Sequence, residues 1–459
     1  MTRLRPSLYR TATCALVVLA AASCGSKPPP PPSVLLVTID TLRADHTSLY
    51  GYDVETTPEL ERWAAGGRVY EHAWAASSWT APSMAMLLTG RARTDNSGTI
   101  RPSELSLAEI LQGYGYATGA VIANPLLNES QGYARGFDNF EIRGAGEQEW
   151  NAERVLGRGQ ELLESYGERR PYFLYLHLFD PHYPYFPDEE GEPLPIRNDS
   201  KRRTAFRNAL PEDKRDLFGE EEYRGIETLI SLYDGEIRRT DRALGRLFAW
   251  MEERGLGERT LVIVTSDHGE GLWQRAPAVG EELKNKVFFP HLYYSHGVQL
   301  YSEQVGVPLV MRGPGMRQGD TRSEDVSLLD VVPTVLEIVG IDNPGDLSGL
   351  SLAADYFPET GREIYSVCSR VSTVTVDGRW RLHVPREHRV DRYGARPELY
   401  DLSFDPKELS PLDDTIRTKQ LVRLVAAWRA RNTGVPEGEI DQEQLELLES
   451  LGYTGEADR

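Results

Sequence analysis

The chain has 459 residues, of which 40% are hydrophobic and 26% are charged, as is typical of a globular protein with a substantial core. This length suits one large domain of helices and strands together with a smaller one. The formal net charge of −19 argues against nucleic acid as the main partner, because binding to phosphate backbones requires a basic surface.

The first 24 residues have the features of an export signal rather than of the folded protein. Three arginines within the first ten residues precede an apolar run at 15–22, which is too short to span a bilayer of about 30 Å. The run leads into LAAASCGS, in which Cys24 follows small residues and resembles the lipidated cysteine of a bacterial lipobox. We expect residues 1–24 to be a lipoprotein signal peptide and Cys24 to anchor the protein to a membrane of the cell envelope, facing the periplasm or the outside. A plain signal peptide cleaved nearby is the alternative.

The segment that follows and the cysteine content agree with this location. Residues 25–33, GSKPPPPPS, predict a stiff polyproline tether that holds the folded part away from the membrane. Cys14 lies in the signal and Cys24 is the expected anchor, so that Cys368 remains alone and cannot form an intramolecular disulfide. Cys368 lies in a strand-like run, and we expect it to be buried and structural.

Three short apolar runs predict buried strands of one parallel sheet. Each ends in acidic or histidine residues: SVLLVTID at Asp40, PYFLYLHLFDPH at Asp180 and His182, and TLVIVTSDHGE at Asp267 and His268. Continuous apolar runs separated by helical segments are typical of parallel sheets covered on both faces. Because ligands bind beyond the carboxyl ends of the strands in such sheets, these polar residues predict a functional site at that edge.

Helical patterns lie between these strands. The segments 105–116 and 225–255 have apolar faces, and the longer one places a row of large side chains on one side: Ile230, Tyr233, Ile237, Leu244, Phe248 and Met251. A stretch from Phe186 to Glu222, rich in proline and charged residues, predicts a surface excursion near the site.

The pattern changes after about Gly345. Asp377-Gly378 is a hairpin signal, and a helix is expected over about 415–431. We therefore predict an α/β fold with a mostly parallel sheet sandwiched by helices over 34–345. A small C-terminal α+β subdomain is expected over 346–459.

The stretch SSWTAPSMAMLLTGR, residues 77–91, predicts a helix that starts beside several hydroxyl groups. Pro82 suits the first turn and Gly90 the end, so that Thr80 is expected just ahead of the helix. An oxygen at that place faces free backbone N–H groups and the positive end of the helix dipole, which favours an alkoxide and a bound oxyanion. From these residues alone, plain helix capping by Thr80 is an equal alternative.

Several motifs occur in an order that resembles the sulfatase family of the alkaline-phosphatase superfamily. They are TIDTLRADHTSLYGY, WTAPSMAMLLTGR, LHLFDPHYPY, LYDGEIRRTDRALGRL, VTSDHGEG, SHGVQLYSEQVGVPLVMRGPG and ELYDLSFDPKE, and they span about residues 34–453. The resemblance implies the alkaline-phosphatase/sulfatase-like fold and a metal-dependent hydrolase of anionic esters.

One motif departs from the family pattern at the nucleophile. The family motif reads Cys or Ser, any residue, Pro, Ser, Arg, and its first residue is oxidised to formylglycine. Here Thr80 stands at the nucleophile position, and Met84 replaces the arginine. Because threonine cannot become formylglycine, the usual sulfatase mechanism is not available, and superfamily relatives with an unmodified threonine attack phosphorus. The resemblance therefore implies that Thr80 is the nucleophile, and it favours phosphate mono- or diesters over sulfate esters.

The resemblance also implies the metal ligands, which are Asp40, Thr80, Asp267 and His268. This set suits one divalent cation, either Mn²⁺, Zn²⁺ or Ca²⁺. Thr41 stands where sulfatases often have a second aspartate. Asp180 and His182 lack the Asp-x-x-x-His spacing of the two-zinc relatives, so that we expect a single metal ion.

Further residues are implied to contact the substrate. His182 matches the family histidine that binds the substrate oxyanion, and His296 lies near the residue that handles the ester oxygen and the leaving group. A histidine can donate a proton to a leaving alkoxide near neutral pH. Ser83 and Asn124 are additional candidates for substrate contacts.

Three alternatives to a phosphoester hydrolase are open. The first is a sulfatase that works without formylglycine, and the second is an envelope phospho-group transferase in which an alcohol replaces water. Relatives of the transferase type usually have several membrane-spanning helices, which disfavours it. The third is a non-catalytic binding lipoprotein, which is disfavoured because the whole set of site residues is present.

Overall fold

The computed structural model describes residues 30–144, 150–167, 170–187, 194, 204, 220–272, 294–353, 362–386 and 396–432. From Pro31 onward the chain forms one compact unit. The expected signal peptide with Cys24 lies outside the described residues, as do most of the expected tether and most of the expected excursion at 186–222. Within the described ranges, no helix combines the length and the apolar character needed to cross a membrane.

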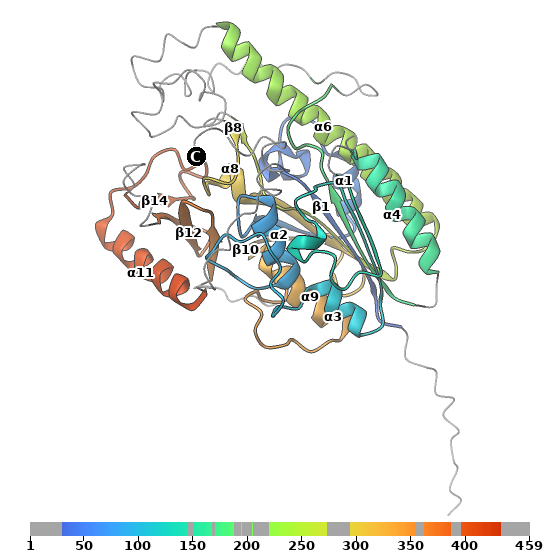
Figure 1. Cartoon of the computed structure of the whole chain (residues 1–459). Coiled ribbons are helices and arrows are strands. Elements are labelled where there is room, and N and C mark those ends of the chain that lie inside the picture. Colours follow the sequence, from blue (N-terminus) through green and yellow to red (C-terminus); the bar gives the residue numbers. More distant parts are fainter. Residues whose placement is uncertain are drawn as a thin grey trace, which may run out of the picture. The chain divides into compact units, whose positions relative to one another are not determined.

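An eight-stranded sheet forms the centre of this unit, with the strand order β10-β2-β9-β6-β1-β5-β3-β4 (Figure 1). Its strands are β1 (Ser33–Ile39), β2 (Arg68–Trp74), β3 (Ala117–Ile122), β4 (Asn139–Ile142), β5 (Tyr172–Leu178), β6 (Thr260–Ser266), β9 (Gly306–Arg312) and β10 (Asp320–Ser327). Within this sheet only β9 runs antiparallel to its neighbours β2 and β6. The predicted mostly parallel sheet is therefore confirmed.

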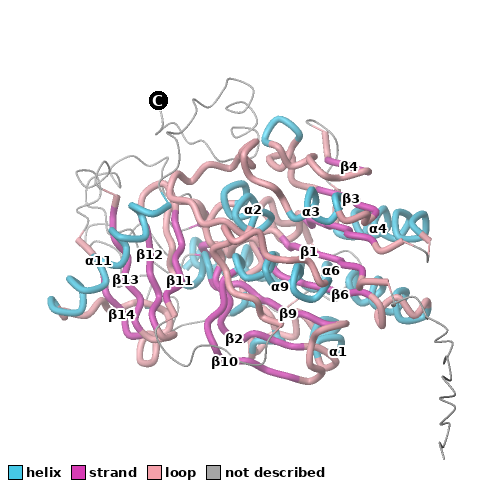
Figure 2. The backbone as a smooth tube through the Cα atoms, turned by 90° about the horizontal axis from the view of Figure 1, so that it is seen from below, coloured by secondary structure: helices cyan, strands magenta, loops and turns pink. Residues whose placement is uncertain are grey.

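Helices cover both faces of the sheet, because its central strands are apolar on both sides (Figures 1 and 2). In β1, Val34 and Leu36 pack into one core cluster, whereas Leu35 and Val37 pack into the other. The first cluster includes residues of α2 (Thr80–Thr89), α3 (Leu107–Gly113) and α9 (Val331–Val339). The second includes residues of α1 (Pro58–Ala64), α4 (Ala152–Tyr166) and α6 (Glu220–Glu253).

The long helix α6 confirms the predicted apolar face, since all six of its expected core residues are buried: Ile230, Tyr233, Ile237, Leu244, Phe248 and Met251. The remaining short elements of the sheet domain are η1 (Ala44–His46), η2 (Ser48–Tyr50), η3 (Glu129–Gln131), β7 (Gly271–Leu272), β8 (Tyr294–Ser295), α8 (Ser302–Val305) and η6 (Leu328–Asp330).

A small antiparallel sheet and one helix form the C-terminal subdomain. The elements are β11 (Glu363–Val367), β12 (Val371–Val376), β13 (Trp380–Pro385), β14 (Glu398–Asp401) and α11 (Thr415–Asn432). Asp377 and Gly378 both have positive φ in the turn between β12 and β13, as the hairpin signal predicts. Cys368 is buried directly after β11, as expected. The α+β character is confirmed, whereas the exact boundary at 345/346 stays a prediction.

Glu408 joins this subdomain to the main sheet domain. Its side chain is fully buried and accepts hydrogen bonds from the backbone N–H and the hydroxyl of Ser302, both at 2.6 Å. The same carboxylate lies 2.6 Å from His383 Nε2 and 3.1 Å from Arg381 Nε, both on β13. The start of α8 is thus tied to the C-terminal sheet by one buried carboxylate.

Candidate active site

The candidate residues gather where three adjacent strands end. β6, β1 and β5 are neighbours in the sheet and run parallel, so that their carboxyl ends lie at one edge. Asp40 directly follows β1, and Asp267 and His268 directly follow β6. Thr80 is the first residue of α2, one position inside the helix rather than just ahead of it as predicted.

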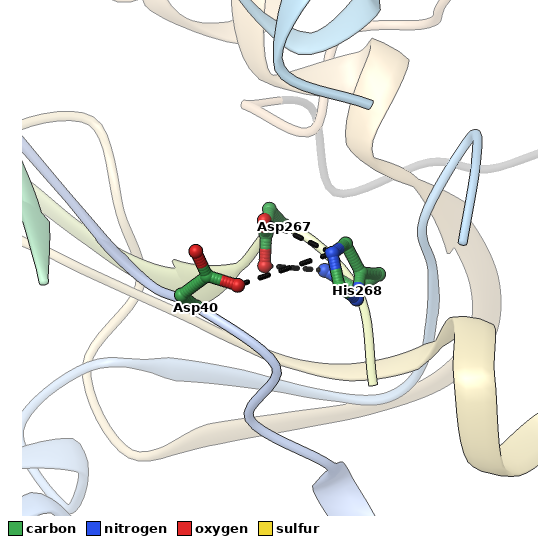
Figure 3. A group of neighbouring side chains, drawn as sticks. All are labelled: Asp40, Asp267 and His268. Atoms are coloured by element: carbon green, nitrogen blue, oxygen red, sulfur yellow. Dashed lines mark hydrogen bonds and ion pairs between the residues drawn. The ribbon is translucent and has the colours of Figure 1, made fainter. Parts of the chain in front are cut away.

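Asp40, Asp267 and His268 form a group that can hold a metal ion. One ligand atom from each lies within 4.8 Å of the others, and Figure 3 shows the three side chains converging. His268 Nε2 lies 3.3 Å from Asp267 Oδ2 and 3.9 Å from Asp40 Oδ1. Thr80 Oγ1 lies 3.1 Å from the same nitrogen, so that all four predicted ligands meet at one place.

The hydrogen bonding of the two carboxylates fits a bound cation. Asp40 Oδ1 and Asp267 Oδ2 are buried and have no hydrogen-bond partner among the described residues. The other oxygen of each group is occupied: Asp40 Oδ2 accepts from Asn124 Nδ2 at 2.7 Å, and Asp267 Oδ1 accepts from the backbone N–H of His268 at 2.8 Å. A buried anionic oxygen is costly without a partner, so that the residues present fit a divalent metal ion.

The tautomer of His268 also suits a metal ligand. Its Nδ1 lies 2.8 Å from the carbonyl oxygen of Gly269, which can only accept, so that Nδ1 carries the proton and Nε2 offers a lone pair. Gly269 is required at this position, because a Cβ there would lie 2.2 Å from the carbonyl oxygen of Glu303. The Asp-His-Gly order of the motif therefore aims one imidazole nitrogen at the carboxylates.

The hydroxyl of Thr80 is directed into this cluster. The side chain is fully buried, and its Oγ1 contacts His268 Nε2, which argues against plain helix capping. Ser83, one turn along α2, donates from its hydroxyl to the carbonyl oxygen of Asp267 at 2.6 Å. This bond fixes the first turn of α2 against the end of β6 and so holds Thr80 in place.

Two further histidines extend the cluster. The ring of His296 lies 4.5 Å from that of His268 and 5.2 Å from that of His182, measured between centroids. Both His182 and His296 are buried. The structure therefore brings together all six residues predicted as ligands or catalytic groups.

Comparison with known proteins identifies the family of the chain. The family model described as Sulfatase matches residues 32–341, more than half of the chain. The chain belongs to the sulfatase family. The resemblance found in the sequence motifs is thereby confirmed, and this sulfatase-family protein is an ester hydrolase by membership of that family.

Curated relatives carry sulfatase names. The chain is 25% identical over 442 residues to arylsulfatase K of Mus musculus, covering 82% of this chain and 75% of the relative. The match to the Rattus norvegicus protein of the same name covers 32% of its length, at 28% identity over 200 residues. N-acetylglucosamine-6-O-sulfatase of Bacteroides thetaiotaomicron is 23% identical over 483 residues, covering 80% of each chain.

Solved structures share the fold of this sulfatase-family protein. A phosphonate monoester hydrolase from Silicibacter pomeroyi has a TM-score of 0.64 at 21% identity, covering 90% of this chain and 98% of that one. A protein solved in complex with its substrate D-glucosamine-2-N,6-O-disulfate has a TM-score of 0.65 at 17% identity, covering 87% and 97%. At these sequence identities, the structural similarity shows that the proteins share a fold.

The two carboxyl groups of the sulfatase-family site differ in their ionisation. Burial opposes the ionisation of Asp40, but nearby His182 and the hydrogen bond from His177 outweigh it and hold the pKa of Asp40 well below its ordinary value. Burial, and then the charge of Asp40, raise the pKa of Asp267. A dication between the two would favour the ionised form of both.

The two outer histidines have opposite pKa shifts. Burial lowers the pKa of His182 to about 4. Burial also acts against protonation of His296, but the carboxylate of Glu270, 3.1 Å from His296 Nδ1, outweighs it and raises the pKa of His296. At neutral pH, His296 therefore holds a proton more readily than His182 does.

The remaining predicted residues have contacts that bear on their roles. The amide of Asn124 donates to Asp40, and the hydroxyl of Ser83 donates to the backbone, so that contact of either with substrate stays a prediction. Asp180 accepts from the backbone N–H of Ala152 at 2.8 Å and pairs with Arg239. These contacts give Asp180 a structural role, and the expectation of a single metal ion stays a prediction.

Two residues of the site were missed by the sequence reasoning, namely Glu270 and His177. Glu270 stands in the DHGE motif two residues after His268, so that its place in the motif could have pointed to it. His177 interrupts an apolar strand, and this interruption was the available signal.

Proposed function

We propose that this protein is a metal-dependent hydrolase of phosphate mono- or diesters that uses Thr80 as its nucleophile. The observation that carries the proposal is the place of Thr80 Oγ1, at the start of α2 and 3.1 Å from His268 Nε2. Threonine cannot form the aldehyde hydrate on which formylglycine sulfatases depend. An unmodified hydroxyl beside a cation site suits attack on phosphorus.

Asp40, Asp267 and His268 would hold the cation, with Thr80 completing the set. One divalent ion, Mn²⁺, Zn²⁺ or Ca²⁺, would lower the pKa of the threonine hydroxyl and neutralise charge on the transferring group. The positive end of α2 adds a favourable field at the same oxygen.

The reaction is proposed to proceed in two displacements. Thr80 loses its hydroxyl proton to water, and its Oγ1 bonds to phosphorus as the bond from phosphorus to the leaving alkoxide breaks. His296, whose protonation Glu270 favours, gives its proton to the alkoxide. Water then attacks the phosphothreonine and passes a proton to His296, while the Thr80 oxygen leaves and regains a proton from solvent.

His182 is proposed to bind a non-bridging oxygen of the substrate. Its Nδ1 lies 2.7 Å from the carbonyl oxygen of Tyr183 and therefore carries a proton, which leaves Nε2 without one in the neutral ring. His182 can donate from Nε2 only after taking up a second proton, and the negative charge of an entering phosphate favours that uptake.

Sulfate esters are the second candidate substrates, and the names of the curated relatives favour them. A matched panel of aryl phosphate monoesters, diesters, phosphonates and sulfates, each tested with Mn²⁺, Zn²⁺ or Ca²⁺, separates the two. We expect the highest kcat/KM for one of the phosphorus esters. A higher kcat/KM for the sulfate would contradict the phosphoester proposal and leave the fold assignment standing. An added alcohol that becomes phosphorylated would instead indicate the transferase alternative.

We propose in addition that the protein is anchored to an envelope membrane by a lipid on Cys24. The support is the LAAASCGS sequence, in which small residues precede this cysteine. Changing Cys24→Ala should block maturation or release the protein from the membrane fraction, because the thiol that carries the lipid is gone. Cys14→Ala, in the same leader, is the matched control and should fractionate as the parent does. If Cys24→Ala also fractionates as the parent does, the anchor proposal is wrong.

A further inference from the structure

His177 is a buried polar residue in the middle of the apolar strand β5. Its side chain is fully buried, and β5 pairs with β1 in a register that places His177 opposite Thr38. Tyr175 lies two residues earlier on the same strand and therefore on the same face of the sheet. The three polar side chains of Thr38, Tyr175 and His177 thus form a row inside the core.

The contacts in this row lead to Asp40. His177 Nδ1 lies 2.7 Å from Thr38 Oγ1 and 2.9 Å from the Tyr175 hydroxyl. His177 Nε2 lies 3.3 Å from Asp40 Oδ2. Since an ionised carboxylate can only accept, Nε2 donates to Asp40, and Nδ1 accepts from a hydroxyl on its other side. Both ring nitrogens are satisfied, which is the condition under which such a polar row is tolerated in a core.

The row restricts the orientation of the Asp40 carboxylate. Asp40 Oδ2 accepts hydrogen bonds from two side chains. Asn124 Nδ2, which follows β3, lies at 2.7 Å, and His177 Nε2, on β5, lies at 3.3 Å. Asp40 Oδ1 has no hydrogen-bond partner in the described part of the chain and lies 3.9 Å from His268 Nε2. Two donors on one oxygen oppose rotation of the carboxylate, because rotation would break both bonds at once.

We propose that His177 is a positioning residue for the metal centre, and that it holds Asp40 so that Oδ1 is presented to the divalent cation. The hydroxyl groups of Thr38 and Tyr175 lie beside Nδ1 and support the ring by donating to this nitrogen, which fixes the plane of the ring. This inference rests on the metal site of the proposed function, and it does not depend on Thr80 or on the class of ester that is hydrolysed. Groups that orient metal ligands commonly contribute about 10–100-fold to metal affinity.

The test measures metal affinity rather than turnover. We expect His177→Met, which fills a similar volume without a donor, to weaken Mn²⁺ binding by about 10–100-fold in isothermal titration calorimetry of the metal-free full-length chain. His177→Gln can return an amide N–H toward Asp40 and should recover most of that loss. Wild-type affinity in His177→Met, or an equal loss in His177→Gln, would overturn the proposal.

The chain contains a matched control for the stability of the fold. In the C-terminal sheet, His383 Nδ1 lies 2.9 Å from Thr373 Oγ1 and its Nε2 lies 2.6 Å from Glu408 Oε1, the same threonine–histidine–carboxylate order away from the metal centre. His383→Met should lower Mn²⁺ affinity far less than His177→Met, because His383 reaches the loop of His268 only through Glu408, Ser302 and α8. An equal loss of affinity in this variant would show that binding follows general stability, and would overturn the positioning role.

Two further outcomes are distinguishable. If His177→Met does not fold, as judged by circular dichroism, Tyr175→Phe decides, since it removes one hydroxyl beside Nδ1 and should weaken Mn²⁺ binding severalfold. Unchanged Mn²⁺ binding in Tyr175→Phe would then overturn the proposal. If the wild-type chain binds none of Mn²⁺, Zn²⁺ and Ca²⁺, the metal site itself fails, which is a different result from wild-type affinity in the variants.

Discussion

Replacing Thr80 with alanine should remove nearly all turnover, by on the order of 10³-fold or more, while leaving the fold and the metal content mostly intact. The reason is that Thr80 Oγ1 is the hydroxyl that contacts His268 Nε2 inside the cluster. Without it no covalent intermediate can form, and residual binding of the substrate supports only slow attack by water. The measurement is kcat/KM on the best ester of the substrate panel.

Two controls make this result specific. Thr80→Ser should keep partial activity, because the hydroxyl remains and a methyl group is lost. Thr89→Ala removes a hydroxyl at the other end of α2 that donates to the carbonyl oxygen of Ala85, and it should leave turnover nearly unchanged. Mass spectrometry of acid-quenched protein should find a phosphoryl adduct on the Thr80 peptide. Wild-type rates in Thr80→Ala would mean that water or another residue is the nucleophile.

Changing Asp267→Asn should lower metal affinity and activity together, by on the order of 10²-fold or more, since anionic carboxylate ligands contribute at least as much as the groups that orient them. The change preserves the shape of the side chain but replaces a buried carboxylate, whose Oδ2 has no hydrogen-bond partner among the described residues, with a neutral amide. Asp40→Asn should act in the same way. Chelator treatment of the wild-type chain should abolish turnover, and added Mn²⁺, Zn²⁺ or Ca²⁺ should restore it.

Elemental analysis checks the number of ions. We expect about one equivalent of divalent metal per active chain, because the described residues bring together one set of carboxylate and imidazole ligands. Asp180→Asn is the matched control, since Asp180 also follows a central strand but pairs with Arg239. Its metal content should stay at about one equivalent. Two tightly bound ions in the wild-type chain would contradict the prediction and would group the protein with the two-zinc relatives.

The central part of the fold was predictable because its signals are local. Continuous apolar runs identified β1, β5 and β6, and helical periodicity identified α6. The antiparallel direction of β9 was not predictable, because strand pairing depends on contacts between distant segments rather than on the pattern within one. The same holds for β2 and β10, whose mixed burial gives them a weaker pattern.

The site was predictable to the extent that motifs mark its residues. Asp40, Thr80 and His268 lie at the ends of elements, where polar side chains break an apolar pattern and attract notice. His177 lies inside a strand, and its importance depends on the register that sets it opposite Thr38. Register is a property of the folded sheet, and therefore the row that reaches Asp40 becomes visible only in three dimensions.

The buried carboxylate of Glu408 affects the order in which parts of the structure can form during synthesis of the chain. Ser302, which it holds, begins α8, and the carbonyl oxygens of the next two residues of that helix accept from the backbone N–H groups of Gly269 and Glu270 at 2.8 and 3.1 Å. Every residue assigned to the chemistry leaves the ribosome before Glu408 does. The loop that carries His268 thus gains its last support only when the C-terminal sheet has been synthesised and docked. A nascent chain released at about residue 345 would contain the whole catalytic set and still lack the anchor of α8. If C-terminal segments were exchanged between relatives, the new segment would have to restore the contact of Glu408 with Ser302.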